Sequence, residues 1–132
     1  MKSRYIIFAD DDADDLELIT GFFKQYNRNI NVLEFKNGKE VLKFLDDFAI
    51  TTSTPELIVL DINMPRLNGW ETLIAIRNHP YYAKIPVIIY TTSDNEVDEE
   101  QCRQLNASWI NKPSNIEGVK QIAKVISDFF HI

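Results

Sequence analysis

Three carboxylates directly follow apolar runs of strand-like composition. Asp10 and Asp11 follow YIIFA (residues 5–9), and Asp61 follows LIVL (residues 57–60). Such runs, rich in β-branched residues and apolar on both faces, are typical of strands in a buried parallel sheet. Ligands of doubly wound sheets bind beyond the carboxyl ends of the strands. We therefore expect these three side chains to lie together at that edge.

The same edge should receive a hydroxyl and an ammonium group. Thr91 ends the apolar run VIIYT, and Lys112 follows ASWI. Neighbouring anions are costly without a cation, and one lysine does not balance three carboxylates. Oxygen ligands without histidine or thiol select a hard divalent cation, and few protein ligands supplemented by water favour Mg²⁺ over Ca²⁺. The sequence therefore predicts a Mg²⁺ site.

This set of side chains suits phosphoryl transfer. Asp61, on the predicted central strand, can attack phosphorus as a nucleophile. A divalent cation would spread the charge of the transferred group, while Lys112 and Thr91 would bind its remaining oxygens. The same groups would then hold the resulting aspartyl phosphate.

The acidic run continues beyond the first pair with Asp12, Asp14 and Asp15. These residues fall at the start of the first predicted helix. Carboxylates there cap free backbone N–H groups and oppose the helix dipole. We expect all three to have this structural role and to take no part in the site.

The rest of the pattern supplies the elements that position these groups. Strands are expected at residues 5–9, 31–35, 57–60, 87–91 and 107–110. Helices are expected between them and at the C-terminal end, where an apolar stripe comprises Ile116, Val119, Ile122, Ile126 and Phe129. This βα alternation predicts an α/β fold with a parallel, doubly wound sheet and right-handed crossovers. The two longer connections, residues 46–56 and 78–86, are predicted to be surface loops.

Length and composition limit the classes of function. A chain of 132 residues fits one domain, and its net charge of −6 argues against a nucleic-acid-binding surface. There is one cysteine, so no intramolecular disulfide forms, which favours a reducing compartment. The sequence has no apolar run long enough for a membrane span and no signal peptide. We expect a cytoplasmic protein that does not bind membranes.

Four motifs in fixed order carry a family resemblance. They are the pair Asp10–Asp11, the segment LDINMPRLNG around Asp61, the pair Thr91–Thr92 and the pair Lys112–Pro113. Over essentially its whole length the chain resembles the receiver domain of two-component response regulators. It resembles the stand-alone type, including those that accompany phytochrome-like sensor kinases. The resemblance implies one receiver domain over residues 1–132, with a flavodoxin-like (βα)5 fold and strand order 2-1-3-4-5.

The resemblance also implies a role for each acidic residue of the site. Asp61 would be the phosphoacceptor. Mg²⁺ would be bound directly by Asp11, by Asp61 and by the backbone carbonyl of Asn63, and Asp10 would act through water.

Three further roles follow from the resemblance at the ends of the last two strands. Lys112 would bind the phosphoryl group, and Thr91 would be the switch hydroxyl. Trp109 stands where the family usually has Tyr or Phe. It would move inward on phosphorylation, although its size makes the inward position harder to reach. The family often has Gly-Ala before the last strand, where this chain has Asn106-Ala107; asparagine also tolerates a positive φ.

The implied function is signalling without enzymatic turnover. A sensor histidine kinase or a histidine phosphotransfer protein would donate the phosphoryl group. A downstream protein would read the state of the face formed by the fourth helix, fifth strand and fifth helix. The sequence leaves open whether the protein is a monomer or a homodimer.

Two alternatives remain open at the level of sequence. A phosphatase of the haloacid dehalogenase type also places a nucleophilic aspartate after a strand, but it resembles D-x-D, and Asn63 stands at the position of the acid. A pseudo-receiver that only binds partners would have an incomplete site, whereas this set of residues is complete.

Overall fold

The computed structural model describes residues 4–49 and 53–129. Five strands alternate with five α-helices along the chain. The strands are β1 (Tyr5–Ala9), β2 (Asn31–Phe35), β3 (Leu57–Leu60), β4 (Val87–Thr91) and β5 (Ala107–Asn111). The helices are α1 (Ala13–Tyr26), α2 (Gly38–Phe44), α3 (Gly69–Arg77), α4 (Glu96–Gln104) and α5 (Ile116–Asp128).

The strands form one parallel sheet with the order β2-β1-β3-β4-β5, which confirms the predicted fold class and strand order. Four predicted strand ranges agree with the structure, and β5 extends one residue further, to Asn111. The extension has a clear cause: Asn111 pairs with Thr91, and the N–H of Lys112 donates to the Thr91 carbonyl at 2.8 Å.

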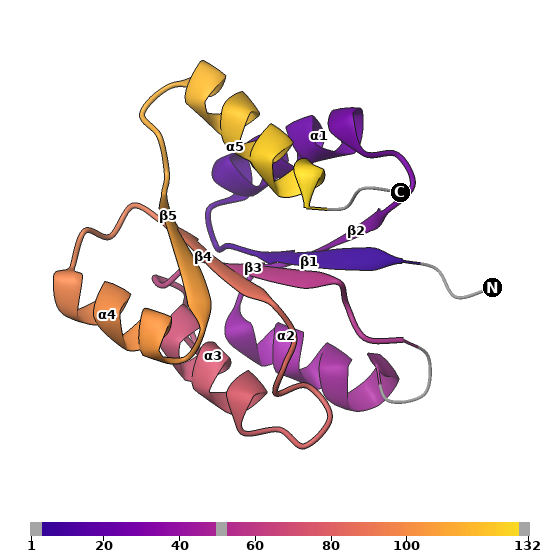
Figure 1. Ribbon diagram of the computed structural model, residues 1–132, viewed down its shortest axis with the longest axis vertical. Coiled ribbons are helices and arrows are strands. Elements are labelled where there is room, and N and C mark those ends of the chain that lie inside the picture. Colours follow the sequence, from indigo (N-terminus) through magenta and orange to yellow (C-terminus); the bar gives the residue numbers. More distant parts are fainter. Residues whose placement is uncertain (1–3, 50–52, 130–132) are drawn as a thin grey trace.

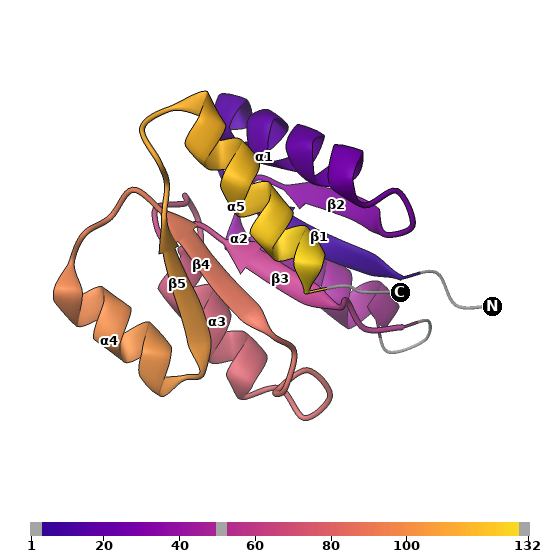
Figure 2. The same cartoon turned by 45° about the horizontal axis from the view of Figure 1, so that its top comes forward.

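The sheet lies between two layers of helices (Figures 1 and 2). Helices α1 and α5 cover one face, and α2, α3 and α4 cover the other. Alternate side chains of each strand enter opposite layers, so Ile6 and Phe8 of β1 pack under α1 and α5 while Ile7 packs on the other side. All five residues of β1 and β4 are buried. Burial on both faces explains why these strands read as continuous apolar runs.

Helix α1 begins at the point where the acidic run leaves the sheet. Asp12 is its N-cap, and the Asp12 side chain accepts hydrogen bonds from the backbone N–H groups of Asp14 and Asp15 at 3.0 Å. This confirms the capping role that was predicted for Asp12. The side-chain cap fixes the first turn of the helix directly after the strand-end residues Asp10 and Asp11.

The two longer connections differ from the prediction that they are surface loops. The first begins as a π-helical continuation of α2 at Leu45–Ala49, whereas residues 50–52 lie outside the described part of the chain. In the second, Tyr82 is only 1% exposed, and its phenol donates a hydrogen bond to the Leu45 carbonyl. Tyr82 also stacks on His79, with ring centroids 4.2 Å apart. Aromatic packing therefore brings this connection into the core.

The predicted apolar stripe of α5 is correct in its middle and wrong at its ends. Val119 and Ile126 are buried, and Ile122 is partly buried against α1 and the sheet. Ile116, the first residue of α5, is 63% exposed, and Phe129, which follows the last residue of the helix, is 68% exposed.

Two backbone features bear on the sequence predictions. Asn106 has a φ of 60°, so the turn before β5 uses the left-handed conformation that asparagine tolerates. No peptide bond in the described residues is cis, and the Lys112–Pro113 bond is therefore trans. In the same part of the chain, no helix is both long and apolar enough to span a membrane.

Candidate functional site

The predicted site residues converge at the carboxyl edge of the sheet. Asp10 and Asp11 follow β1, and Asp61 follows β3. The two strands are adjacent, with Ala9 paired to Leu60, so their following residues leave the sheet side by side. Carboxylate oxygens of all three aspartates lie within 4.8 Å of one another. Asp10 and Asp61 are buried, whereas Asp11 is exposed.

Lys112 enters this acidic group from the end of β5. Its Nζ lies 2.7 Å from Asp10 Oδ2 and 2.9 Å from Asp61 Oδ2, and its side chain is 7% exposed. Burial on its own would lower the pKa of Lys112, but hydrogen bonds to the surrounding carboxylates outweigh it and raise the pKa. Lys112 is therefore a permanent cation at the centre of the site.

A third carboxylate also contacts Lys112, contrary to the sequence prediction. Asp15 Oδ2 lies 2.9 Å from Lys112 Nζ, so Asp15 does more than begin a helix. The capped first turn of α1 turns this side chain toward the lysine, while Asp14 stays exposed. The interaction spans 97 positions of the chain. Only the direction of the side chains in the folded helix reveals it, so sequence reasoning had no signal for it.

The electrostatics of the acidic group suit a cation. Burial raises the pKa of Asp10 to about 6, although hydrogen bonding to Lys112 and to the Asp12 N–H opposes this shift. Three carboxylates with one ammonium leave an excess of negative charge among Asp10, Asp11 and Asp61. Their donor atoms are all oxygen, which fits a hard divalent ion such as Mg²⁺. Asn63 lies beside them, and its N–H donates to Asp61 Oδ1 at 3.3 Å.

Thr91 lies fully buried at the end of β4. Its Oγ1 accepts a hydrogen bond from the Ser93 N–H at 3.2 Å, which defines the start of the loop before α4. Asn111 secures the same loop, because its Nδ2 donates to the Ser93 carbonyl at 2.7 Å. Sequence reasoning missed Asn111, since the predicted strand stopped one residue before it.

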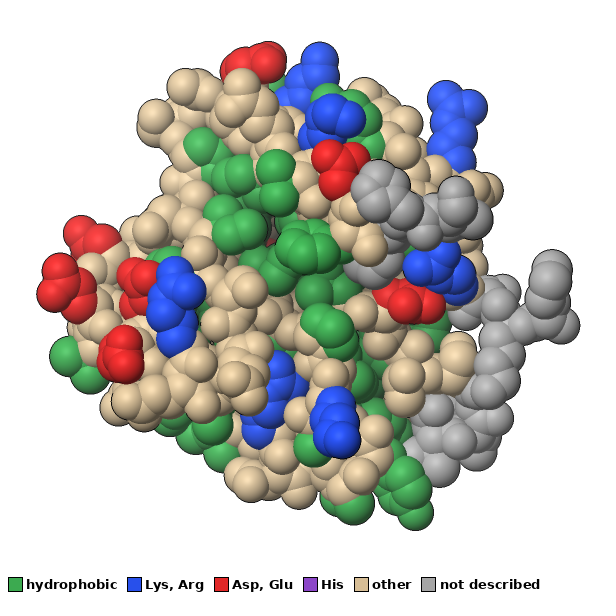
Figure 3. Space-filling view, viewed as in Figure 1, with side chains coloured by type: hydrophobic (Ala, Val, Ile, Leu, Met, Phe, Trp, Pro, Cys, Tyr) green, Lys and Arg blue, Asp and Glu red, His purple; other side chains and the backbone are tan. Residues whose placement is uncertain are grey.

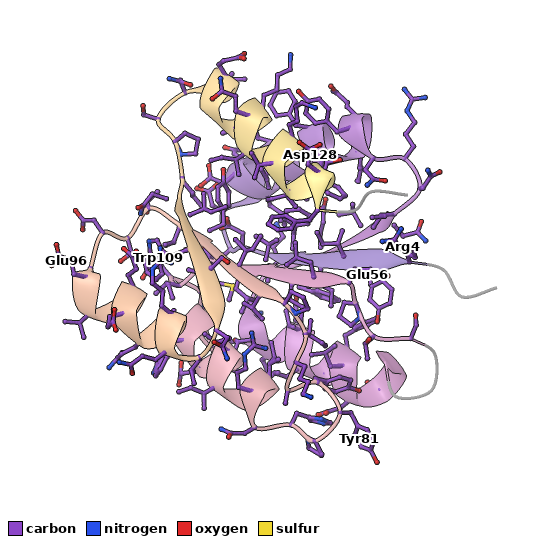
Figure 4. All side chains as sticks on the ribbon, viewed as in Figure 1. Arg4, Glu56, Tyr81, Glu96, Trp109 and Asp128 are labelled. Carbon is purple, nitrogen blue, oxygen red and sulfur yellow. The ribbon has the colours of Figure 1, made fainter. Side chains whose placement is uncertain are left out.

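Trp109 lies on the side of β5 that faces α4 (Figure 4). It is 8% exposed and packs in the same cluster as Cys102 of α4. The expectation that the size of Trp109 hinders its inward movement on phosphorylation remains a prediction. Its Nε1 is buried and has no hydrogen-bond partner among the described residues. The switching role of Trp109 remains a prediction.

Comparison with known proteins agrees with this geometry. The family model described as "Response regulator receiver domain" matches residues 6–124. Response regulator Rcp1 of Synechocystis sp. is 26% identical over 130 residues, covering 96% of this chain and 88% of Rcp1. Chemotaxis protein CheV1 of Helicobacter pylori is 25% identical over 123 residues, covering 93% of this chain but only 38% of CheV1.

Solved structures give the same result. The phosphorylated cyanobacterial phytochrome response regulator RcpA superimposes with a TM-score of 0.87 at 30% identity, covering 96% of this chain and 92% of that chain. The Mn²⁺-bound form of Rcp1 superimposes with a TM-score of 0.86 at 26% identity, covering 96% and 93%. Sequence, fold and the arrangement of the acidic group with Lys112 all point to one family. The chain belongs to the response regulator receiver domain family of two-component signalling proteins.

Proposed function

We propose that this protein accepts a phosphoryl group on Asp61 in a Mg²⁺-dependent reaction and thereby switches a partner-binding surface. The donor would be a sensor histidine kinase or a histidine phosphotransfer protein. One observation carries the proposal: the Asp61 carboxylate lies 2.9 Å from Lys112 Nζ and within 4.8 Å of the carboxylates of Asp10 and Asp11. A nucleophile, a fixed cation and a set of metal ligands are thus assembled at one point.

The chemistry follows from these positions. An Asp61 oxygen attacks phosphorus, a new O–P bond forms, and the bond between phosphorus and the donor breaks, with its electron pair leaving on the donor. Lys112 binds one oxygen of the transferred group. The Thr91 hydroxyl gives up its contact with Ser93 and binds another. Bound Mg²⁺ would supply charge stabilisation for the phosphoryl oxygens.

The proposed ligands of Mg²⁺ are Asp11, Asp61 and the backbone carbonyl of Asn63, with Asp10 acting through water. The exclusive use of oxygen donors supports a hard cation. The Mn²⁺-bound form of Rcp1 is a relative that holds a divalent metal ion. We assign Mg²⁺ rather than Ca²⁺ because the protein itself supplies few ligands.

The output surface would be the face formed by α4, β5 and α5. Thr91 lies where β4 meets the loop to α4, so movement of its hydroxyl would reach that loop through Ser93. Figure 3 shows acidic side chains gathered over α4 and a hydrophobic stretch between α5 and the sheet. Val97 and Ile116, on α4 and α5, are 64% and 63% exposed. A downstream protein or a second copy of the chain would bind there, and Trp109 would move with the switch.

We also propose where this function takes place and which protein donates the phosphoryl group. Residues 1–132 would form one receiver domain in the cytoplasm, without a role in binding nucleic acid or membranes. The likeness to the phytochrome response regulator RcpA supports a phytochrome-type sensor kinase as the donor. The phosphatase and pseudo-receiver alternatives have no comparable support, because the family match and the complete acidic group both favour a phosphoacceptor.

Acetyl phosphate provides a direct test of phosphoryl acceptance. The purified protein is incubated with acetyl phosphate and MgCl₂, and its intact mass is measured. We expect one labile phosphoryl adduct in the wild type and none in Asp61→Asn or with EDTA. Asp14→Asn, an exposed carboxylate on the same edge, should form the adduct normally. An unmodified wild type, or equal labelling of Asp61→Asn, would overturn the proposal, and sustained hydrolysis of phosphate esters would favour a phosphatase.

A further inference from the structure

The contact between Asp15 and Lys112 links the site to helix α1. Lys112 Nζ contacts three carboxylates: Asp10 at 2.7 Å, Asp61 at 2.9 Å and Asp15 at 2.9 Å. An ammonium group has three hydrogens to donate, so all of them are engaged. The side chain of Lys112 is 7% exposed, whereas that of Asp15 is 41% exposed. Asp15 therefore closes the solvent side of an otherwise buried cluster.

The backbone of Asp15 is held in place independently of Lys112. The Asp12 side chain accepts the N–H of Asp15 at 3.0 Å, which holds the first turn of α1. Asp12 is in turn linked to the site, because its own N–H donates to Asp10 Oδ1 at 2.9 Å. A carboxylate on a capped helical turn costs less conformational entropy to position than one on a free loop.

Unlike the other two carboxylates that contact Lys112, Asp15 has no second task in the proposed reaction. In the proposed function, Asp61 would receive the phosphoryl group and would also bind the metal, and Asp10 would act on the metal through water. Both carboxylates therefore change their relation to Lys112 during the reaction. Asp15 has neither task, and so it is the one partner that can keep the ammonium in place throughout.

We propose that Asp15 is a positioning residue for phosphoryl transfer, which holds the Lys112 ammonium beside Asp61 while the other two carboxylates exchange partners. This inference rests on the proposed phosphoacceptor function. It assigns to helix α1 a direct part in the geometry of the site. A charge-assisted hydrogen bond of this length is among the stronger polar contacts in proteins, and it acts here on a group that must be aimed at one oxygen.

The first test observes the ammonium group without phosphate or metal. In ¹⁵N-labelled protein, a lysine NH₃⁺ group gives a resolved resonance when hydrogen bonding slows its exchange with water. We expect one such resonance in the wild type, assigned by its loss in Lys112→Gln. It should broaden or vanish in Asp15→Ala and persist in Asp14→Ala. A sharp, unshifted resonance in Asp15→Ala would show that Asp15 does not hold the ammonium.

The second test measures the rate of adduct formation with acetyl phosphate and MgCl₂. We expect Asp15→Ala to slow the reaction roughly three- to tenfold. Asp14→Ala, which removes the same charge one position earlier, should react at the wild-type rate. If Asp15 acts through Lys112, adding Asp15→Ala to Lys112→Gln should cause no further loss. An equal loss in both backgrounds, or a faster reaction in Asp15→Ala, would overturn the proposed role.

The outcomes separate this inference from the function on which it rests. If the wild type forms no adduct, the phosphoacceptor function fails, and the positioning role fails with it. If the wild type and Asp15→Ala form the adduct at the same rate, only the role of Asp15 fails. Circular dichroism and thermal melting of each variant establish that it is folded before rates are compared.

Discussion

The acidic run at the start of the chain divides into residues with different tasks. Asp10 and Asp11 remain at the strand end within the acidic group, and Asp12 caps α1. Asp15 pairs with Lys112, whereas Asp14 is exposed. The pattern of residue types predicts the first two roles, because strand ends and helix starts are visible in sequence. It does not predict the third, since which carboxylate faces Lys112 depends on the rotation of the first helical turn.

The buried carboxyl of Asp10 should make stability depend on pH. Its pKa of about 6 lies above the ordinary value of 3.8, mainly because of burial. A raised pKa in the folded state stabilises the fold at low pH, and that contribution is lost as pH rises through about 6. Without divalent metal, we expect urea unfolding to show a fall of about 1–3 kcal/mol from this group between pH 4.5 and roughly 7.5.

Asp10→Asn isolates this effect. An asparagine cannot ionise, so the variant should lack this part of the pH dependence and should exceed the wild type in unfolding free energy at neutral pH. Asp14→Asn removes an exposed charge and serves as the control, with a pH profile like that of the wild type. Parallel pH profiles for the wild type and Asp10→Asn would contradict the assignment of a raised pKa to Asp10.

Among the elements of residues 4–49 and 53–129, alternating apolar runs and amphipathic stretches predict the presence of each strand and each α-helix. They do not predict the π-helical segment Leu45–Ala49 or the buried connection around Tyr82. The reason is physical: the two segments are joined by the hydrogen bond from Tyr82 to the Leu45 carbonyl, between residues 37 positions apart in sequence. Local composition, rich in turn-forming residues, gives no indication of such a contact.

The Tyr82 phenol should contribute measurably to stability. Tyr82→Phe keeps the ring but removes the hydrogen bond that the phenol donates to the buried Leu45 carbonyl, which should lower the unfolding free energy by about 1–3 kcal/mol. The neighbouring Tyr81 is 67% exposed, so Tyr81→Phe is a matched control and should change it little. Urea denaturation compares the two. Equal stability of both variants would refute a structural role for the Tyr82 hydroxyl.

The loop between β4 and α4 should depend on Asn111. Removal of its hydrogen bond to the Ser93 carbonyl in Asn111→Ala should loosen the loop and speed amide exchange at Ser93, whose N–H is held by Thr91. Ser108→Ala, on an exposed position of the same strand, should leave exchange at Ser93 unchanged. The rate of amide hydrogen exchange at Ser93, measured by NMR, is compared between the two variants. Unaltered protection in Asn111→Ala would mean that the loop is held without this side chain.

For the whole molecule, topology rather than local sequence assembles the site. Asp10 and Asp61 are 51 positions apart and meet only because β1 and β3 are neighbours in the sheet. Their convergence could be predicted because parallel doubly wound sheets place all carboxyl ends at one edge. The hydrogen-bond partners Asp15 and Asn111 could not be predicted, because side-chain directions decide them. The cost of the assembly is an excess of negative charge in a partly buried cluster.

A divalent cation should therefore stabilise the fold. Binding to the folded state alone raises stability by about 1.4 kcal/mol when the free ion is at ten times its dissociation constant. We expect MgCl₂ to raise the Tm of the wild type above that in NaCl of equal ionic strength. Asp11→Asn, which removes a proposed ligand, should largely abolish the rise, and Asp14→Asn should retain it. A Tm that responds equally to both salts would contradict a specific metal site.

Chemical mapping shows directly whether Asp61 carries the phosphoryl group. After reaction with acetyl phosphate and MgCl₂, borohydride reduces an aspartyl phosphate to homoserine, which peptide mass spectrometry locates. We expect homoserine at position 61 in the wild type and at no aspartate in a control without phosphodonor. Homoserine at Asp10, Asp11 or another carboxylate, with position 61 unmodified, would contradict this expectation.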